Sequence, residues 1–336
     1  MQPLPDAYRK LIATELTTDF RQAAEIVEVP MPAPGPGEVI VQNRFAGVNA
    51  TDVNITAGRY DPDAEPPFDL GAEAAGVVAA VGSAVKHVQV GDAVVTSTLG
   101  GGYREYHTVA ARHVVPVPEA SPEALSVVVS GLTASIALSA VGRMSRDQTV
   151  LVTAAAGGTG QYAVQLAKQA GNHVVGTCGT DEKADFLRTL GCDRPINYRK
   201  EDVAEVLAAE YPKGIDLVYE SVGGALFDAC VAALAVHGRL LSIGYISEYV
   251  EGPDAVEAPR IYTRLLGRSA SVHGFFLPHF RDHYAEHTRR LFELLGSGRL
   301  TVSIDPVPFE GLEAVPDAVE HLHGGKNVGK VVVRFA

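Results

Sequence analysis

Apolar residues in the first 125 positions form short, strand-like runs. Clusters of turn residues such as PMPAPGPGE (30–38) and YDPDAEPPFDLG (60–71) separate them. Short apolar runs between Gly- and Pro-rich breakers are typical of strands. The predicted strands include EVIVQNRFAGV (38–48), GVVAAVG (76–82), AVVTSTL (93–99) and YHTVA (106–110). The pattern predicts an irregular, β-rich domain.

From about residue 126 the pattern changes to strands that alternate with helices. The predicted strands are TVLVTA (149–154), HVVGTC (173–178), PINY (195–198), DLVYESVG (216–223) and GRLLSIGY (238–245). Helices are predicted over SVVVSGLTASIALSAVG (126–142), GTGQYAVQLAKQAG (158–171) and DEKADFLRTLG (181–191). The strands are almost continuously apolar, as burial on both faces requires. This alternation predicts an α/β fold with a doubly wound parallel sheet.

The length of 336 residues is enough for two domains. We expect a β-rich domain over residues 1–126 and a nucleotide-binding domain over residues 127–270. The segment 271–336 contains a long helix near residues 279–298 and a last strand, GKVVVRFA (329–336). We expect this segment to complete the parallel sheet and then return to the first domain.

Composition and charge narrow the range of partners. The formal net charge is −12, which disfavours nucleic acid and anionic membranes as partners. No apolar run is expected to reach the ~18 residues of a membrane span, and no signal peptide is visible. Cys178, Cys192 and Cys230 form no CxxC pair, so we expect reduced thiols and a cytoplasmic protein.

The stretch VLVTAAAGGTGQ (150–161) predicts a dinucleotide site. Ala155, Gly157 and Gly160 take the three glycine positions of a G-x-G-x-x-G fingerprint, with Gly158 and Thr159 between them. Small residues there allow the tight turn, the approach of a diphosphate to the backbone and close helix packing. The following helix offers free N–H groups to the anion.

The end of the second strand favours NADPH over NADH. NAD enzymes usually carry an acidic residue there, which binds the ribose 2′-hydroxyl. This chain has Cys178 instead, followed by Thr180 and Lys183. The Lys183 ammonium can pair with a 2′-phosphate. The alternative is that Lys183 is a solvated residue of the first helical turn, beside Asp181 and Glu182.

Together these motifs resemble the medium-chain dehydrogenase/reductase superfamily along nearly the whole chain. Within it, the chain is similar to the zinc-free branch of quinone oxidoreductases and prostaglandin reductases. The stretches that carry the resemblance are NATDVNITAGRYDP (49–62), VLVTAAAGGTGQ (150–161), GTDEKADFLRTLGCDRPINY (179–198), VYESVGG (218–224), GYISEY (244–249), VHGFFL (272–277) and GKNVGKVVV (325–333). The resemblance implies a Rossmann domain that binds NADPH, a GroES-like catalytic domain and a homodimer.

The resemblance also makes zinc an unexpected ligand. Asn49 stands where zinc enzymes of the superfamily carry a ligand Cys, and Ala72 where they carry a ligand His, although Glu73 of their GHE motif is retained. A catalytic zinc needs three protein ligands of the Cys, His or carboxylate type, and three cysteines cannot form a four-cysteine lobe. We therefore expect neither a catalytic nor a structural zinc.

Without zinc, conjugate reduction is the easier chemistry. Hydride adds to the β-carbon of an enone, and hydrogen-bond donors stabilise the enolate. The resemblance implies that Tyr249, Tyr60 and Asn49 lie in the active site. A tyrosine, with a pKa of about 10, is suited to donate to an enolate. The alternative for each tyrosine is a loop aromatic whose hydroxyl is in water.

Cofactor contacts are implied position by position. The diphosphate turn is expected from Ala155, Gly157, Gly158, Thr159 and Gly160, and the 2′-phosphate site from Thr180, Lys183 and Tyr198. Further contacts are implied for Ser221, Gly244, Tyr245, Phe275, Phe276 and Asn327. Tyr198, Phe275 and Phe276 have ordinary aromatic packing as their alternative.

These inferences predict an NADPH-dependent reductase of activated C=C bonds, of the 2-alkenal/one or 15-oxoprostaglandin Δ13 type. An NADPH:quinone oxidoreductase with a small-molecule quinone substrate is the first alternative. A crystallin-like protein that binds NADPH without turnover is the second. A zinc alcohol dehydrogenase is the last.

Overall fold

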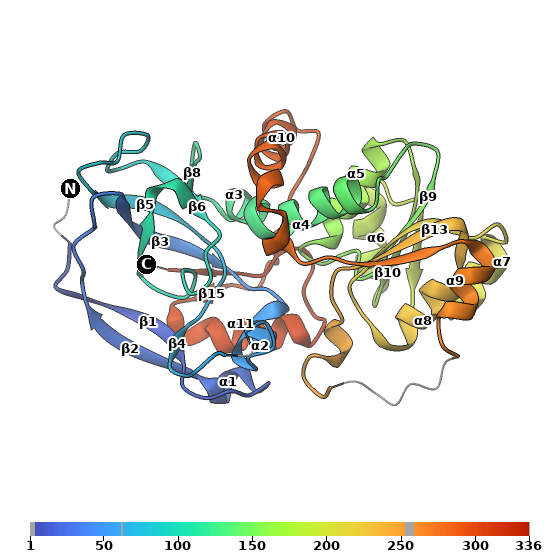
Figure 1. Ribbon diagram of the computed structural model, residues 1–336, viewed down its shortest axis with the longest axis horizontal. Coiled ribbons are helices and arrows are strands. Elements are labelled where there is room, and N and C mark those ends of the chain that lie inside the picture. Colours follow the sequence, from blue (N-terminus) through green and yellow to red (C-terminus); the bar gives the residue numbers. More distant parts are fainter. Residues whose placement is uncertain (1–3, 62, 253–258, 336) are drawn as a thin grey trace. The chain divides into compact units, whose positions relative to one another are not determined.

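The computed structural model describes residues 4–61, 63–252 and 259–335, and the chain divides into two compact units (Figure 1). The β-rich unit comprises Met1–Val129 and Ile304–Ala336, and the parallel-sheet unit comprises Ser130–Ser303. The sequence placed its boundaries at residues 126 and 270. The second division lies within the segment 271–336, whose first part belongs to the parallel-sheet unit and whose second part belongs to the β-rich unit. The β-rich unit is therefore built from both ends of the chain.

The parallel-sheet unit contains one six-stranded sheet, in the order β11-β10-β9-β12-β13-β14, with every adjacent pair parallel. Its strands are β9 (Thr149–Val152), β10 (His173–Cys178), β11 (Arg194–Asn197), β12 (Ile215–Glu220), β13 (Leu234–Ser242) and β14 (Ser271–Gly274). Counted from β9, this is the order 3-2-1-4-5-6 of a dinucleotide-binding Rossmann fold. The strand order reverses between β9 and β12, and dinucleotides bind across such a point.

Apolar side chains from successive strands form the core of this unit. Leu151, Val175, Ile196, Val218 and Leu240, one from each of five strands, are all fully buried. Its helices are α4 (Leu132–Ile136), α5 (Gly160–Gln169), α6 (Asp181–Thr189), α7 (Val203–Glu210), α8 (Gly224–Ala232), α9 (Tyr262–Arg268) and α10 (Tyr284–Gly296).

Side-chain caps fix where two of these helices begin. The Thr180 hydroxyl accepts a hydrogen bond from the Lys183 amide at 3.2 Å, which starts α6. The Asp202 carboxylate accepts one from the Glu205 amide at 2.9 Å, which starts α7.

The β-rich unit contains a three-stranded and a seven-stranded sheet. The smaller has the order β2-β1-β4, and the larger has the order β15-β16-β3-β5-β6-β8, with β7 also paired to β3. The strands are β1 (Ala7–Ala13), β2 (Ala24–Pro30), β3 (Glu38–Gly47), β4 (Phe68–Asp69), β5 (Ala74–Val81), β6 (Ala93–Thr96), β7 (Tyr106–Ala110), β8 (Val114–Pro116), β15 (Phe309–Glu310) and β16 (Val332–Arg334). The helices are α1 (Phe20–Ala23), α2 (Thr51–Thr56), α3 (Pro122–Ser126) and α11 (Val315–His323). Because β16 pairs antiparallel with β3, the last strand does return to the first domain.

The stretch Pro122–Val141 corrects one sequence expectation. It is a continuous helix of 20 residues with a mean hydropathy of 2.0, long and apolar enough to cross a membrane. However, 72% of its apolar window is buried within the protein, and the core helix of a globular protein passes the same test. The two turns Val127–Gly131 and Ala137–Val141 are π-helical, and Ser121 caps the helix with Pro122 in its first turn.

Candidate cofactor and active site

The predicted cofactor residues of the parallel-sheet unit all lie on the side of the sheet where its strands have their carboxyl ends. All of them follow the carboxyl end of a strand, where parallel α/β sheets bind their ligands. They are Ala155, Gly157, Gly158, Thr159 and Gly160 after β9, Thr180 and Lys183 after β10, Tyr198 after β11, Ser221 after β12, Gly244 and Tyr245 after β13, and Phe275 and Phe276 after β14.

The bend after β9 is a close-packed turn without bulky side chains. The Ala155 amide donates to the Thr177 carbonyl at 3.0 Å, which ties the bend to β10. A Cβ at Gly160 would lie 2.6 Å from the Ala155 carbonyl oxygen, so only glycine fits there. A Cβ at Gly157 would meet only the Ala154 carbonyl oxygen, at 3.2 Å. Gly160 is therefore required by packing, whereas Gly157 leaves its outer side open to a ligand.

Two of the residues predicted for a 2′-phosphate, Thr180 and Lys183, follow the end of β10. Lys183 lies in the first turn of α6, three residues after its cap Thr180. Tyr198 is 51% exposed, and its hydroxyl lies against Gly179, where an added Cβ would be 2.6 Å from the oxygen. The structure thus brings Thr180, Lys183 and Tyr198 to the ends of two adjacent strands.

Aromatic residues surround the ends of β13 and β14. Tyr245 is 39% exposed and packs edge-on against Tyr249, with ring centroids 4.6 Å apart. Phe275 is buried and stacks on Phe280 at 4.8 Å, whereas Phe276 is partly exposed beside His279.

The two tyrosines implied as donors have different environments. Tyr249 is almost fully buried, and its hydroxyl oxygen accepts a hydrogen bond from the Tyr245 amide at 3.3 Å. Tyr60 is half-buried in the β-rich unit, and its oxygen accepts from the Asn54 amide nitrogen at 2.9 Å.

Asn327 lies in the β-rich unit, in the loop that precedes β16. Its side-chain amide donates to the Gly329 carbonyl at 3.0 Å, and the Val328 amide donates to the buried Asp305 carboxylate at 2.8 Å. These bonds hold the GKNVGK loop in a defined conformation.

Asn49 belongs to a buried polar cluster with Glu73 and Lys330. The Lys330 ammonium lies 2.5 Å from Glu73 Oε1 and donates to Asn49 Oδ1 at 2.7 Å and to the Val48 carbonyl at 3.0 Å. The Asn49 amide nitrogen in turn donates to Glu73 Oε1 at 2.9 Å and to the Gly47 carbonyl at 3.3 Å. Both of its N–H bonds are thus directed to partners within the β-rich unit. The motif GKNVGK contained Lys330, but nothing in the sequence pointed to its partners.

A second buried carboxylate adjoins this cluster. Asp52 Oδ2 accepts from the Tyr103 hydroxyl at 2.6 Å and from the backbone N–H of Asn49 at 2.8 Å. Burial raises the pKa of Asp52 to about 6, against the lowering effect of the Tyr103 hydrogen bond. Tyr103 reaches Asp52 because Asn43 holds the preceding glycine loop through the carbonyls of Gly101 and Gly102.

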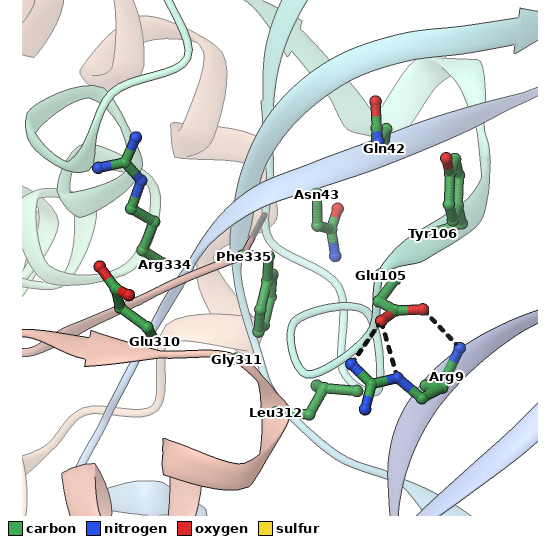
Figure 2. Close-up of a pocket in the computed structure, with 10 residues that line it drawn as sticks. All are labelled: Arg9, Gln42, Asn43, Glu105, Tyr106, Glu310, Gly311, Leu312, Arg334 and Phe335. Atoms are coloured by element: carbon green, nitrogen blue, oxygen red, sulfur yellow. Dashed lines mark hydrogen bonds and ion pairs between the residues drawn. The ribbon is translucent and has the colours of Figure 1, made fainter. Parts of the chain in front are cut away.

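A separate cavity of about 380 Å³ opens in the β-rich unit (Figure 2). Figure 2 shows the Arg9–Glu105 ion pair at one side of it and Phe335 at another. The side chains that line it include none of the predicted cofactor or catalytic residues. Its polar groups are mixed in charge, and we assign it no part in the chemistry.

Comparisons with known proteins agree with this geometry. Residues 35–119 match the family Alcohol dehydrogenase GroES-like domain, and residues 158–294 match the family Zinc-binding dehydrogenase. A mouse protein named prostaglandin reductase-3 is 48% identical over 342 residues, which cover 99% of this chain and 90% of the mouse protein. The chain belongs to the medium-chain dehydrogenase/reductase superfamily. A probable quinone oxidoreductase of Leishmania amazonensis is 44% identical over 98% of this chain and 99% of its own length.

Solved structures of this superfamily share the fold. A mycobacterial protein solved as a complex with NADPH superposes with a TM-score of 0.85 at 32% identity, over 97% of this chain and 99% of its own. The Escherichia coli quinone oxidoreductase complexed with NADPH has a TM-score of 0.83 at 29% identity, again over 97% and 99%. The α/β fold with a Rossmann and a GroES-like domain is thereby confirmed.

The residues present do not fit the catalytic zinc that one family description implies. Asn49 and Ala72 replace two ligands, and neither amide nor methyl group is a zinc ligand of the usual kind. The retained Glu73 is already neutralised by the Lys330 ammonium, whose charge would repel a divalent cation. Within residues 4–61, 63–252 and 259–335, no group of three or more His, Cys, Asp or Glu side chains is arranged to hold a metal.

Proposed function

We propose that this chain is a zinc-independent, NADPH-dependent reductase of activated C=C bonds, of the 2-alkenal/one or 15-oxoprostaglandin Δ13 type. The observation that carries the proposal is a parallel sheet with the strand order of a dinucleotide-binding fold, in a chain whose buried Glu73 is paired with the Lys330 ammonium. The full-length likeness to prostaglandin reductase-3 supports the substrate class. The two NADPH complexes among the structural relatives support the cofactor.

The cofactor, when bound, supplies the hydride, and the residues of this chain bind and orient it. The bend at Gly157 receives the diphosphate on backbone N–H groups at the start of α5. Lys183 pairs with the 2′-phosphate, and Tyr198 lies beside it.

A hydroxyl donor then stabilises the negative charge that collects on the substrate oxygen as an enolate. Tyr60 is the donor we favour, because it is half-buried and the hydrogen bond from Asn54 polarises its hydroxyl. Tyr249 contributes by supporting Tyr245, against which it packs. Asn49 acts by holding Glu73 and Lys330 in place.

An NADPH:quinone oxidoreductase is the second candidate function. The identity of 44% to a probable quinone oxidoreductase favours it, and quinones accept hydride by the same scheme. A steady-state screen of the protein with NADPH against 2-alkenals, enones and quinones separates the two.

We expect turnover with enones to exceed turnover with quinones, and Tyr60→Phe to lower kcat for the best enone by about tenfold or more. Activity confined to quinones would establish the second candidate. NADPH binding without turnover on any acceptor would contradict both and favour a binding protein.

We further propose a cytoplasmic homodimer that acts on small molecules and binds neither nucleic acid nor membrane. The charge of −12 and the burial of the apolar helix support this view. In the sheet, β14 pairs only with β13 among the described strands, so its outer edge can pair with a second copy.

A further inference from the structure

Glu220 is a buried carboxylate at the ligand edge of the parallel sheet. It is the last residue of β12, and none of its surface is exposed. The sequence contained it in VYESVGG without giving any reason to single it out.

The Glu220 side chain holds the loop that follows it. Its Oε1 accepts from the amides of Val222 at 2.7 Å and Gly223 at 3.0 Å. The Thr153 hydroxyl donates to the same oxygen at 3.3 Å and accepts from the Ser221 amide at 2.8 Å. Three consecutive backbone N–H groups, at 221–223, are thus fixed by Glu220 and Thr153 together.

A second loop rests on the first. The Ser247 hydroxyl donates to the Val222 carbonyl at 2.6 Å, and the Ile246 amide donates to the Ser221 carbonyl at 3.2 Å. A Cβ at Gly223 would lie 2.8 Å from the Cβ of Tyr245. The position of Tyr245, after β13, therefore depends on the loop that Glu220 holds.

Burying a carboxylate at this place costs free energy, because the charged group loses its contacts with water. Burial raises the pKa of Glu220, and its second oxygen has no hydrogen-bond partner among the described residues. An apolar side chain would fill the same space without the cost of desolvation. What an apolar side chain cannot provide is an acceptor for Val222 and Gly223, so the contribution of Glu220 is the shape of the loop.

The order of the sheet tells which part of a dinucleotide this loop meets. The diphosphate lies at the bend after β9, and the adenosine ribose lies at the end of β10. Because β12 and β13 lie on the opposite side of β9, the nicotinamide half extends over their ends.

We propose that Glu220 is a positioning residue that shapes the loops after β12 and β13 for the nicotinamide half of NADPH. The proposal rests on the proposed use of NADPH. It predicts that loss of the carboxylate weakens the binding of NADPH but not the binding of a ligand that carries only the adenosine half.

The test compares dissociation constants for NADPH and for adenosine 2′,5′-bisphosphate by calorimetry. Glu220→Met fills the same space but removes the acceptor for Val222 and Gly223, and Thr153→Val removes the hydroxyl that accepts from Ser221. Asp216→Asn is the matched control, because Asp216 also accepts a backbone bond, from Thr149 at 2.8 Å, but near the amino end of the same strand.

For both Glu220→Met and Thr153→Val we expect the Kd for NADPH to rise about tenfold, which corresponds to ~1.4 kcal/mol. The Kd for the bisphosphate should stay within about twofold of wild type, and Asp216→Asn should change neither constant.

Equal weakening of both ligands, or of neither, would overturn the proposal and leave Glu220 a purely structural residue. Failure of the wild-type protein to bind NADPH would instead overturn the proposed function. The two failures are therefore distinguishable.

Discussion

At the scale of single residues, Lys330 compensates a buried carboxylate in the β-rich unit. Its ammonium makes three short contacts, to Glu73, Asn49 and the Val48 carbonyl, while only 2% of its surface is exposed. A buried ion pair gains little over an apolar pair, but removing one partner leaves a charge without compensation. Lys330 therefore supports Glu73 in the place where zinc enzymes of the superfamily bind metal.

A double-mutant cycle measures this interaction. We expect Lys330→Met to lower the free energy of unfolding by about 3–5 kcal/mol, since Glu73 stays buried and charged. Adding Glu73→Gln should restore most of the loss, because the double variant buries no charge. Urea unfolding followed by circular dichroism checks both values.

Lys168→Met is the surface control for this cycle. Lys168 pairs with Asp193 at 2.6 Å but is 42% exposed, so its loss should cost less than about 1 kcal/mol. A Lys330→Met protein as stable as the Lys168→Met protein would contradict the role given to Lys330.

At the scale of elements, the bend between β9 and α5 separates two uses of glycine. Gly160 has no room for a Cβ, because backbone carbonyls of residues 154 and 155 fill the space. Gly157 has room at the cost of a small shift of one carbonyl. Gly160 builds the turn, and Gly157 leaves its outer side open, where we propose that the diphosphate binds.

Alanine substitution should therefore affect stability at Gly160 and NADPH affinity at Gly157. Gly160→Ala should lower the Tm by several degrees, because the backbone must move. Gly157→Ala should leave the Tm nearly unchanged but raise the Kd for NADPH by at least tenfold. Thermal unfolding and NADPH titration of both variants test this, and an unaltered affinity in Gly157→Ala would show that no phosphate approaches there.

At the scale of the whole molecule, the two outer strands of the parallel sheet are not equivalent. Pro195 within β11 lacks an N–H group and discourages pairing at that edge. The edge strand β14, of sequence SVHG, contains no proline. Since the Phe275 amide donates inward to the Ser242 carbonyl, the alternation of the backbone directs the Val272 N–H outward. The outer edge of β14 is thus the better place for a second copy.

The dimer prediction follows from that edge. We expect the wild-type protein to have twice the mass of one chain in light scattering, and Val272→Pro to be a monomer, because proline removes an outward donor. Retained NADPH binding is the control for an intact fold. A Val272→Pro protein that remains a dimer would place the interface elsewhere.

Local patterns in the sequence determined much of the fold and of the cofactor site. The strand His173–Cys178 was predicted with its final bounds, and β12 and β13 were predicted with shifts of a few residues. Strand β1 was missed, because the charged residues Arg9 and Lys10 interrupt its apolar residues. The glycine bend was visible because backbone constraints of this kind act between neighbours in the chain.

Tertiary structure alone decided the contacts between distant residues. Lys330 meets Glu73 and Asn49 across more than 250 positions, and Thr153 meets Glu220 across 67. No periodicity or spacing encodes such pairs, since they depend on how strands line up in the folded sheets. The sequence thus indicated most of the elements and predicted a place for a diphosphate, whereas packing of the assembled sheets determined which buried charges compensate one another.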